Sequence, residues 1–129
     1  MPTVLVTGAN RGLGLEFVRQ YRDAGWDVVA TARSSSPELE QLGVRTESLD
    51  MSDLDALATF GERLAGPLDL LIANAGTYGP RDAGDAAGAR EWLDTFTVNT
   101  VAPYLLAQAV LPRVQEAGGK LIAISTRMG

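Results

Sequence analysis

Short apolar runs alternate with amphipathic segments along the whole chain. Five runs have the length and composition of strands in a parallel sheet: residues 3–7, 27–32, 44–50, 68–76 and 120–125. Apolar residues recur at helical spacing in three segments: residues 12–24, 52–64 and 90–116. A shorter helix is indicated by the start signal Ser36-Pro37-Glu38. Because strands that alternate with helices form right-handed βαβ units, we expect one α/β domain over residues 1–129, a doubly wound parallel sheet of five strands with helices on both faces.

A glycine-rich turn joins the first expected strand to the first expected helix. Gly8, Gly12 and Gly14 lie in the stretch "VTGANRGLGLEF". Glycine permits positive φ and has no side chain, so backbone N–H groups can approach a phosphate at the positive end of a helix. Taken alone, the glycines also fit a tight connection without a ligand. Other motifs in the sequence are therefore needed to distinguish a phosphate-binding turn from a simple connection.

Composition excludes several kinds of chemistry. Hydrophobic residues make up 46% of the 129 residues, and 16 acidic against 11 basic residues give a formal charge of -5, with Lys120 the single lysine. Such a chain lacks the clustered basic residues of a nucleic-acid surface. The sequence contains no cysteine and no histidine, which excludes disulfides, thiol nucleophiles and imidazole triads, and we expect no metal site. With no signal-peptide pattern and no apolar run of about 18 residues, we expect a cytoplasmic protein without membrane contact.

Five motifs in order resemble the short-chain dehydrogenase/reductase family. Thr7 and the three glycines match its TGxxxGxG turn, and Asp50 follows the third strand, where the family contacts adenine. "LIANAG" resembles the family's NNAG motif, with Ala73 in place of the first asparagine. "VNTVAPYLL" supplies the helix asparagine, Asn99, and "GGKLIAISTRMG" is similar to the GxIxxISSxxG strand. The segment "STRMG" most resembles the sniffer and C-factor-like branch of this family.

The resemblance implies a Rossmann-like sheet that holds a nicotinamide dinucleotide and is truncated after the fifth strand. Its expected cofactor-binding residues are Gly8, Asn10, Arg11, Gly12, Leu13, Gly14, Arg33, Asp50, Met51, Asn74, Ala75 and Gly76. The implied substrate is a small molecule with a carbonyl or alcohol group. The segment 90–116 resembles a helix of the family's dimer interface, so a homo-oligomer through it is a possible assembly.

The end of the second expected strand indicates which nicotinamide nucleotide is bound. In "VATARS" no carboxylate is present to accept a hydrogen bond from a ribose 2′-hydroxyl, and Arg33 follows the strand. Arg11, in the glycine turn, reaches the same region in the family. Two guanidinium groups suit a dianionic 2′-phosphate, so we expect NADP(H) rather than NAD(H). The alternative is that both arginines are solvated surface charges.

Three residues are candidates for the chemical step. Pro103 has no N–H to donate to the carbonyl of Asn99, so a local kink is expected, and in the family this carbonyl holds a water of the proton relay. The alternative is a proline that only bends a helix. Ser125 and Thr126 end the fifth expected strand, and the resemblance aligns Thr126 with the family's catalytic serine. The choice between these hydroxyls stays open, as does a role as solvated strand-end residues.

The family's YxxxK acid pair is absent from these residues. None of Tyr21, Tyr78 and Tyr104 has a lysine four positions later, and the family places the pair a dozen or more residues beyond the strand-end serine. Two interpretations follow. The chain is the N-terminal part of an NADP(H)-dependent carbonyl reductase or alcohol dehydrogenase, which we favour, or it is a dinucleotide-binding or interaction module without turnover. We expect the 129 residues alone to be inactive.

Overall fold

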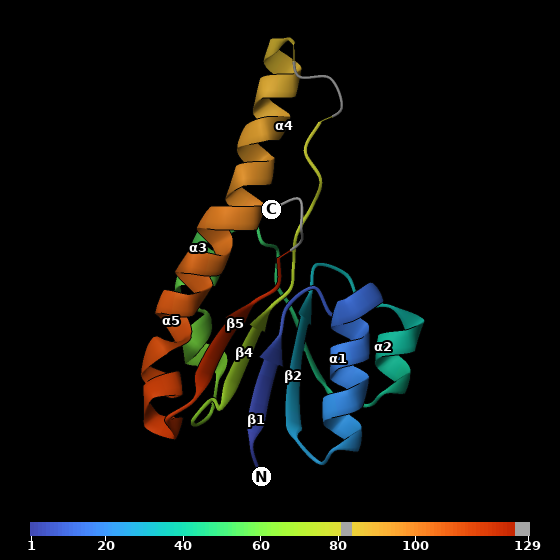
Figure 1. Ribbon diagram of the computed structural model, residues 1–129, viewed down its shortest axis with the longest axis vertical. Helices are drawn as coiled ribbons and strands as arrows, with labels where there is room; N and C mark the ends of the chain where they lie inside the picture. The colour runs from blue at the N-terminus through green and yellow to red at the C-terminus, as the bar shows by residue number, and fades with distance from the viewer. Residues whose placement is uncertain (81–83, 126–129) are drawn as a thin grey trace.

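A computed structural model describes residues 1–80 and 84–125 as three layers, with a parallel sheet between two layers of helices (Figure 1). The strands are β1 (Thr3–Val6), β2 (Asp27–Ala32), β3 (Arg45–Ser48), β4 (Leu70–Ala73) and β5 (Lys120–Ala123). Their spatial order is β3-β2-β1-β4-β5, and all four pairings are parallel. The doubly wound, Rossmann-like fold predicted from the sequence is therefore confirmed.

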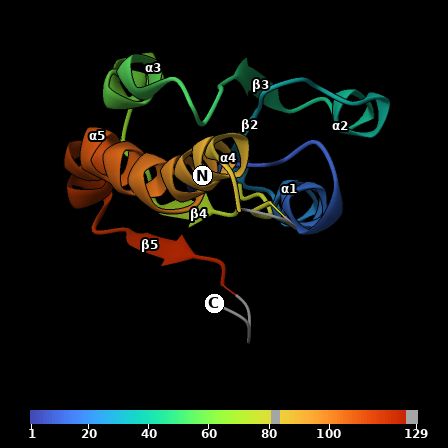
Figure 2. The same cartoon turned by 90° about the horizontal axis from the view of Figure 1, so that it is seen from above.

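Most helical segments pack on the two opposite faces of this sheet, and one extends beyond its edge (Figure 1 and Figure 2). The helical segments are α1 (Gly12–Asp23), α2 (Pro37–Gln41), α3 (Leu54–Ala58), the 3-10 turn η1 (Phe60–Arg63), α4 (Ala86–Phe96), the π-helical turn η2 (Thr97–Val101) and α5 (Ala102–Ala117). Among the described residues, no helix combines the length and the apolar character needed to cross a membrane.

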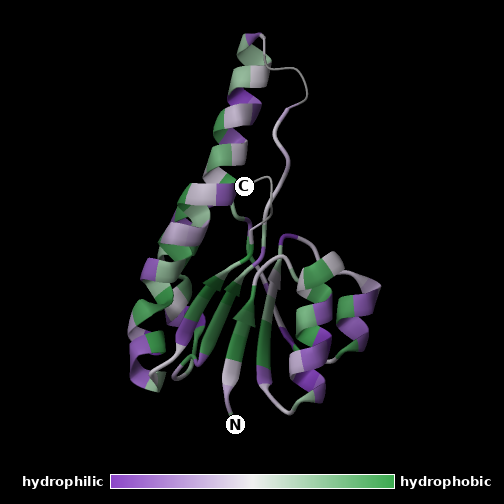
Figure 3. Cartoon of the chain, viewed as in Figure 1, coloured by the Kyte–Doolittle hydropathy of each residue, from purple (hydrophilic) through white to green (hydrophobic). Residues whose placement is uncertain are grey.

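Alternate side chains of the central strands build two separate cores. Val4 and Val6 of β1 pack in the core beneath α1 and α2, whereas Leu5 between them packs with α3, η1 and α5. This follows from the two-residue repeat of a strand, and it explains why β1, β2 and β4 are apolar at nearly every position. Figure 3 shows the hydrophobic colour concentrated on these strands.

Helix starts follow local capping signals. The Ser36 hydroxyl accepts a hydrogen bond from the Leu39 N–H at the start of α2, where Pro37 occupies the first turn, as the sequence predicts. Asp85 caps α4 in the same way by accepting from the Gly88 N–H at 2.8 Å. That cap starts the helix at Ala86, four residues before the predicted position at Arg90.

The two longer predicted helices are interrupted. The segment 52–64 ends as an α-helix at Ala58 and continues as η1, where a Cβ on Gly61 would lie 2.3 Å from the Ala109 carbonyl oxygen of α5. This close backbone contact needs a glycine. The segment 90–116 changes at residues 97–101 into a π-helical turn before α5 begins. Sequence periodicity alone did not separate these turns from regular helix.

The strand β5 is much less covered than β4, its partner. Leu71 and Leu121 pair in register, yet Leu71 is 1% exposed and Leu121 is 44% exposed. The next pair, Ile72 and Ile122, differs in the same way. In Figure 2, β5 lies at the side of the sheet away from β3. The contacts within the described residues therefore leave apolar side chains of β5 in solvent.

Candidate functional site

The predicted site residues meet at one edge of the sheet. In a parallel sheet the carboxyl ends of all strands lie on the same side, and this is where α/β proteins bind ligands. The glycine turn follows β1, Arg33 follows β2, Asp50 follows β3, Asn74 follows β4, and Ser125 follows β5. Thr126, the other candidate hydroxyl, lies outside the described residues. The helix α4 extends past this edge in Figure 1.

The glycine turn has the backbone conformation that the sequence predicts. Gly8 and Gly12 have φ values of 61° and 58°, a region that favours glycine. A Cβ on Gly14 would lie 2.0 Å from the Gly8 carbonyl oxygen, so the start of α1 packs directly on the turn. At Gly12 a Cβ would meet nothing within 4 Å. The start of α1 is thus open at Gly12, and because the first N–H groups of a helix have no partner within the helix, this start fits a bound diphosphate.

Thr7 holds the end of β4 against the end of β1. Its side chain is fully buried, and its Oγ1 atom accepts hydrogen bonds from the N–H groups of both Asn74 and Ala75, each at 3.0 Å. Thr7 belongs to the TGxxxGxG motif but is not among the predicted site residues. The signal was a hydroxyl residue directly before a glycine, at the end of an otherwise apolar strand.

Asn74 connects the same segment to the glycine turn. Its Nδ2 atom donates to the carbonyl of Gly8 at 3.3 Å. A Cβ on Gly8 would lie 2.9 Å from the Ala75 Cα atom, so the two segments are in van der Waals contact. The structure therefore brings Gly8, Asn74 and Ala75, all predicted cofactor residues, into one cluster.

The two predicted phosphate-binding arginines are exposed in the segments that follow β1 and β2. Arg11 is the N-cap residue of α1 and Arg33 directly follows β2. Within the described residues neither guanidinium group makes a hydrogen bond or an ion pair. Ser48, at the end of β3, donates its hydroxyl to the Arg33 carbonyl at 3.4 Å and thus joins the two strand ends. Both arginine side chains remain available to an anion.

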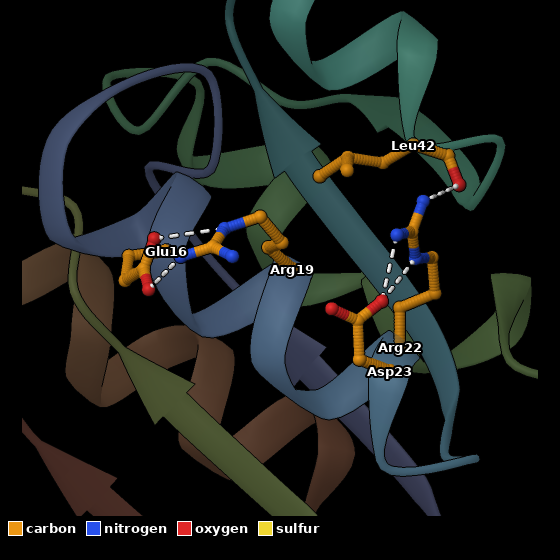
Figure 4. Close-up of polar contacts among 5 residues, drawn as sticks. All are labelled: Glu16, Arg19, Arg22, Asp23 and Leu42. Atoms are coloured by element: carbon orange, nitrogen blue, oxygen red, sulfur yellow. Dashed lines mark hydrogen bonds and ion pairs between the residues drawn. The ribbon is translucent and has the colours of Figure 1, made fainter.

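Glu16 is the first acidic residue of α1 after Arg11, and its hydrogen-bond partners are other residues of the helix. Arg19 and Gln20 donate to the Glu16 carboxylate on the solvent face of the helix, and Figure 4 shows the Arg19 contact. These hydrogen bonds, chiefly that from Arg19, hold the pKa of Glu16 below its ordinary value. They also raise the pKa of the Arg19 guanidinium.

After β3, Asp50 and Met51 lie where the sequence predicts adenine contacts. The exposed Asp50 accepts a hydrogen bond from the Ser52 N–H at 2.8 Å, which closes a turn at the strand end. Met51 is half-buried and packs against the core beneath α5. This turn places one carboxylate and one apolar side chain at the carboxyl edge of the sheet, beside the end of β2.

Asn99 lies in the middle of the π-helical turn. Pro103 has no N–H for the Asn99 carbonyl, and the Ala102 N–H bonds to the Thr97 carbonyl five residues earlier. The irregularity expected at this point is present as a π-helical turn. The Asn99 side chain also accepts from the Thr77 N–H at 2.8 Å and donates to the Thr77 carbonyl at 2.7 Å. This second connection, from η2 to the loop after β4, was not predicted.

The strand-end hydroxyl Ser125 lies one residue beyond the last β5 hydrogen bond. The Ile124 N–H donates to the Ala73 carbonyl at 3.1 Å, so the ladder extends to the residue before Ser125, which is exposed. Lys120 begins β5 and therefore lies at the opposite edge of the sheet from the site. It is not placed to act with Ser125.

Two surface cavities lie away from this edge. One, of about 330 Å³, lies between η1 and α5 and is lined by residues including Glu62 and Arg113. The other, of about 280 Å³, lies at the amino ends of β1 and β2. Neither includes a predicted cofactor residue. Across residues 1–80 and 84–125, no cluster of three acidic side chains is placed to hold a metal ion.

The strand order, the glycine turn at the start of α1 and the motif residues at the carboxyl edge define a Rossmann-like α/β protein. The chain belongs to the short-chain dehydrogenase family, because the family model described as short chain dehydrogenase matches residues 2–129.

Similar proteins agree with this assignment. The chain is 33% identical to gluconate 5-dehydrogenase from Gluconobacter oxydans over 93% of its length and 51% of that enzyme. It resembles the crystal structure of a carbonyl reductase from Pseudomonas aeruginosa PAO1, with 35% identity, a TM-score of 0.85, and coverage of 99% and 63% of the two chains. A short-chain dehydrogenase/reductase from Burkholderia multivorans with bound NADP is 28% identical, with a TM-score of 0.82 and coverage of 97% and 58%. The chain spans about half the length of the curated relatives that it matches.

Proposed function

We propose that the protein containing this chain is an NADP(H)-dependent oxidoreductase that acts on a carbonyl/alcohol pair. The observation that carries the proposal is the open glycine turn at Gly12, together with Arg11 and Arg33, whose guanidinium groups are exposed and have no partner among residues 1–80 and 84–125. A diphosphate fits the N–H groups of the turn, and a 2′-phosphate fits two arginines. The relatives named as a carbonyl reductase and as an NADP-bound reductase support the same function.

Each strand end has a separate task in this proposal. The turn from Gly8 to Gly14, including Asn10 and Leu13, surrounds the diphosphate. Asp50 and Met51 contact the adenine, and the backbone of Asn74, Ala75 and Gly76 faces the nicotinamide half. When bound, the nucleotide supplies the hydride that is exchanged with the substrate.

The residues of the chain would orient the substrate and move its proton. The Asn99 carbonyl, which receives no hydrogen bond from Pro103, would hold a water molecule. Ser125 or Thr126 would donate a hydrogen bond to the substrate oxygen and so stabilise the negative charge that develops there. The proton donor itself, a YxxxK pair in the family pattern, is not among the 129 residues.

Nucleotide titration tests the cofactor part of the proposal. The protein expressed from its complete reading frame should bind NADPH about tenfold more tightly than NADH, because two arginines contact the additional phosphate. Arg33→Ala should remove most of this preference and leave the NADH affinity nearly unchanged. Arg90→Ala, at an exposed arginine on α4, is the matched control and should change neither affinity. Equal affinities for both nucleotides, or no binding by a folded sample, would contradict the proposal.

Turnover tests the chemical part. We expect carbonyl-dependent oxidation of NADPH by the complete protein, and no measurable oxidation by residues 1–129 alone, because the acid pair is missing from them. If the complete protein binds NADPH but reduces no aldehyde or ketone, the non-catalytic binding module is the correct alternative. Turnover by the 129 residues alone would mean that another acid replaces the tyrosine.

A homo-oligomer through the segment 90–116 is a separate proposal. It is supported by three large apolar side chains that α4 leaves more than half exposed, Trp92, Leu93 and Phe96. Exposed apolar patches of this kind mark interaction surfaces. Light scattering of the complete protein and of Phe96→Ser tests it, and a monomer at all concentrations would contradict it.

A further inference from the structure

The hydroxyl of Ser36 joins two segments that each carry one of the exposed arginines. Its Oγ atom donates to the carbonyl of Asn10 at 2.6 Å and accepts from the Leu39 N–H at 3.2 Å. Asn10 directly precedes Arg11 in the glycine turn, and Ser36 follows Arg33 by three residues. One side chain thus caps α2 and connects α2 to the glycine turn.

A second hydrogen bond joins the same two segments. The Ala9 N–H donates to the carbonyl of Thr31, a buried residue of β2, at 3.0 Å. Residues 9 and 10 of the turn are therefore bonded to residues 31 and 36. Arg33 lies between these two attachment points, and Arg11 follows directly after them. The backbone positions from which the two guanidinium groups extend are fixed relative to each other.

We propose that Ser36 is a positioning residue for NADP(H) selectivity, because it holds the start of α2, three residues after Arg33, against the residue before Arg11, so that both arginines can reach one phosphate. This inference rests on the proposed function. Ser36 does not bind the phosphate itself, since its proton is used by the Asn10 carbonyl and a lone pair by the Leu39 N–H.

The effect should be specific to the phosphorylated nucleotide. Two flexible arginine side chains bind a dianion tightly only when their backbones are already in place, because ordering them costs conformational entropy. If the Ser36 hydrogen bond is lost, the segment from Arg33 to the start of α2 is no longer held against Asn10 and stays attached to the turn only through the end of β2. Arg33 can then move relative to Arg11, and the two charges no longer act on the same phosphate. NADH lacks that phosphate and contacts the turn through its diphosphate alone.

The test compares four variants of the protein expressed from its complete reading frame, with NADPH and NADH each titrated against every variant. Ser36→Ala removes both hydrogen bonds of the hydroxyl. Ser36→Gly removes them with a residue that is tolerated at helix N-caps, so it is the variant to use if the alanine form does not fold. Ser36→Thr keeps the hydroxyl. Asp85→Ala removes the N-cap of α4 without affecting the glycine turn, and it is the matched control for loss of a cap.

We expect the NADPH dissociation constant of Ser36→Ala and Ser36→Gly to rise about fivefold, and that of NADH to change less than twofold. Ser36→Thr should bind both nucleotides like the unmodified protein. Asp85→Ala should keep the unmodified ratio of affinities, even if its melting temperature falls.

Two failures can be told apart. If the unmodified protein binds NADPH and NADH equally, the proposed function is wrong, and this inference falls with it. If the unmodified protein prefers NADPH and both hydroxyl-free variants keep that preference, only the role of Ser36 is wrong. An equal weakening of both nucleotides would likewise overturn it, because that result indicates a purely structural hydroxyl.

Discussion

The two sides of the sheet differ in how completely the described residues cover them. Around β1 and β2, the strands are buried on both faces. The end of β1 is joined to the end of β4 by hydrogen bonds to the Thr7 hydroxyl, and the turn after it is joined to β2 by the Ala9 N–H and to the start of α2 by the Ser36 hydroxyl. Around β5, apolar side chains are exposed, and the strand pairs with β4 alone among the described strands. The proposed nucleotide side is thus held by contacts within this chain, whereas the edge that carries Ser125 is held by few of them.

The two sides of the sheet differ in what their function depends on. Binding of a dinucleotide depends on backbone positions that are fixed by buried and bonded residues. The proposed chemistry takes place at the end of β5, a strand whose side chains are partly exposed and therefore contribute little packing energy within the described residues. Substitutions of equal chemistry on the two sides should therefore have unequal effects on stability.

The largest expected difference is between Leu71 and Leu121, which pair in register on β4 and β5. Leu71→Ala should lower the free energy of unfolding of the 129-residue chain by about 3–4 kcal/mol, because it leaves a cavity in a closed core. Leu121→Ala should cost less than about 1 kcal/mol, because the side chain is already partly in solvent. Urea denaturation of both variants measures this. Equal losses would mean that β5 is covered in solution and that the comparison is wrong.

A smaller effect is expected at the glycine turn. In Gly14→Ala the new methyl group would overlap the Gly8 carbonyl oxygen, so the turn or α1 must move, at a cost of about 2–3 kcal/mol in unfolding free energy. NADPH binding should be lost together with the turn geometry. Gly66→Ala is the control, since a Cβ there meets nothing within 4 Å. If Gly14→Ala binds NADPH as the unmodified chain does, the close packing at the turn is not needed for the site.

Thr7 tests the hydrogen bonds between the strand ends. Thr7→Val keeps the shape of the side chain but leaves the N–H groups of Asn74 and Ala75 without their acceptor, so it should cost about 1–2 kcal/mol. Hydrogen exchange of these two amides should become faster. Thr7→Ser, which keeps the oxygen, should restore their protection, and Thr46→Val on the exposed surface of β3 should leave it unchanged. Unaltered exchange in Thr7→Val would show that water replaces the hydroxyl at no cost.

These contacts also show where sequence reasoning succeeds. The fold was predictable because periodicity, capping residues and glycines are local signals, as in Ser36-Pro37-Glu38 and the turn from Gly8 to Gly14. The bonds that hold the site together join distant residues: Thr7 and Asn74 are 67 positions apart, and Ser36 and Asn10 are 26 apart. No local pattern encodes such pairs. The π-helical turn was foreseeable only as an irregularity, because Pro103 removes a donor without specifying the new ladder.

The smallest expected effect is on the solvent face of α1, and it sharpens the contrast with the buried bonds of Thr7. Hydrogen bonds from Arg19 and Gln20 lower the pKa of Glu16 in the folded chain (Figure 4). A carboxyl group with a lowered folded pKa contributes stability above its unfolded pKa, and this contribution is lost as the pH falls through the folded value. Because Glu16 is exposed and its ion pair is screened by solvent and salt, this contribution is small, and Glu16→Gln should leave stability at neutral pH almost unchanged.

An NMR titration of the Glu16 carboxyl carbon measures this shift directly. The pKa should lie below the ordinary glutamate value in the unmodified chain, and it should return toward that value in Arg19→Gln and at high salt. If Glu16→Gln instead destabilised the chain as strongly as Thr7→Val, the solvated face of α1 would contribute as much as the buried strand ends. The stability of the nucleotide side could then not be assigned to its interior.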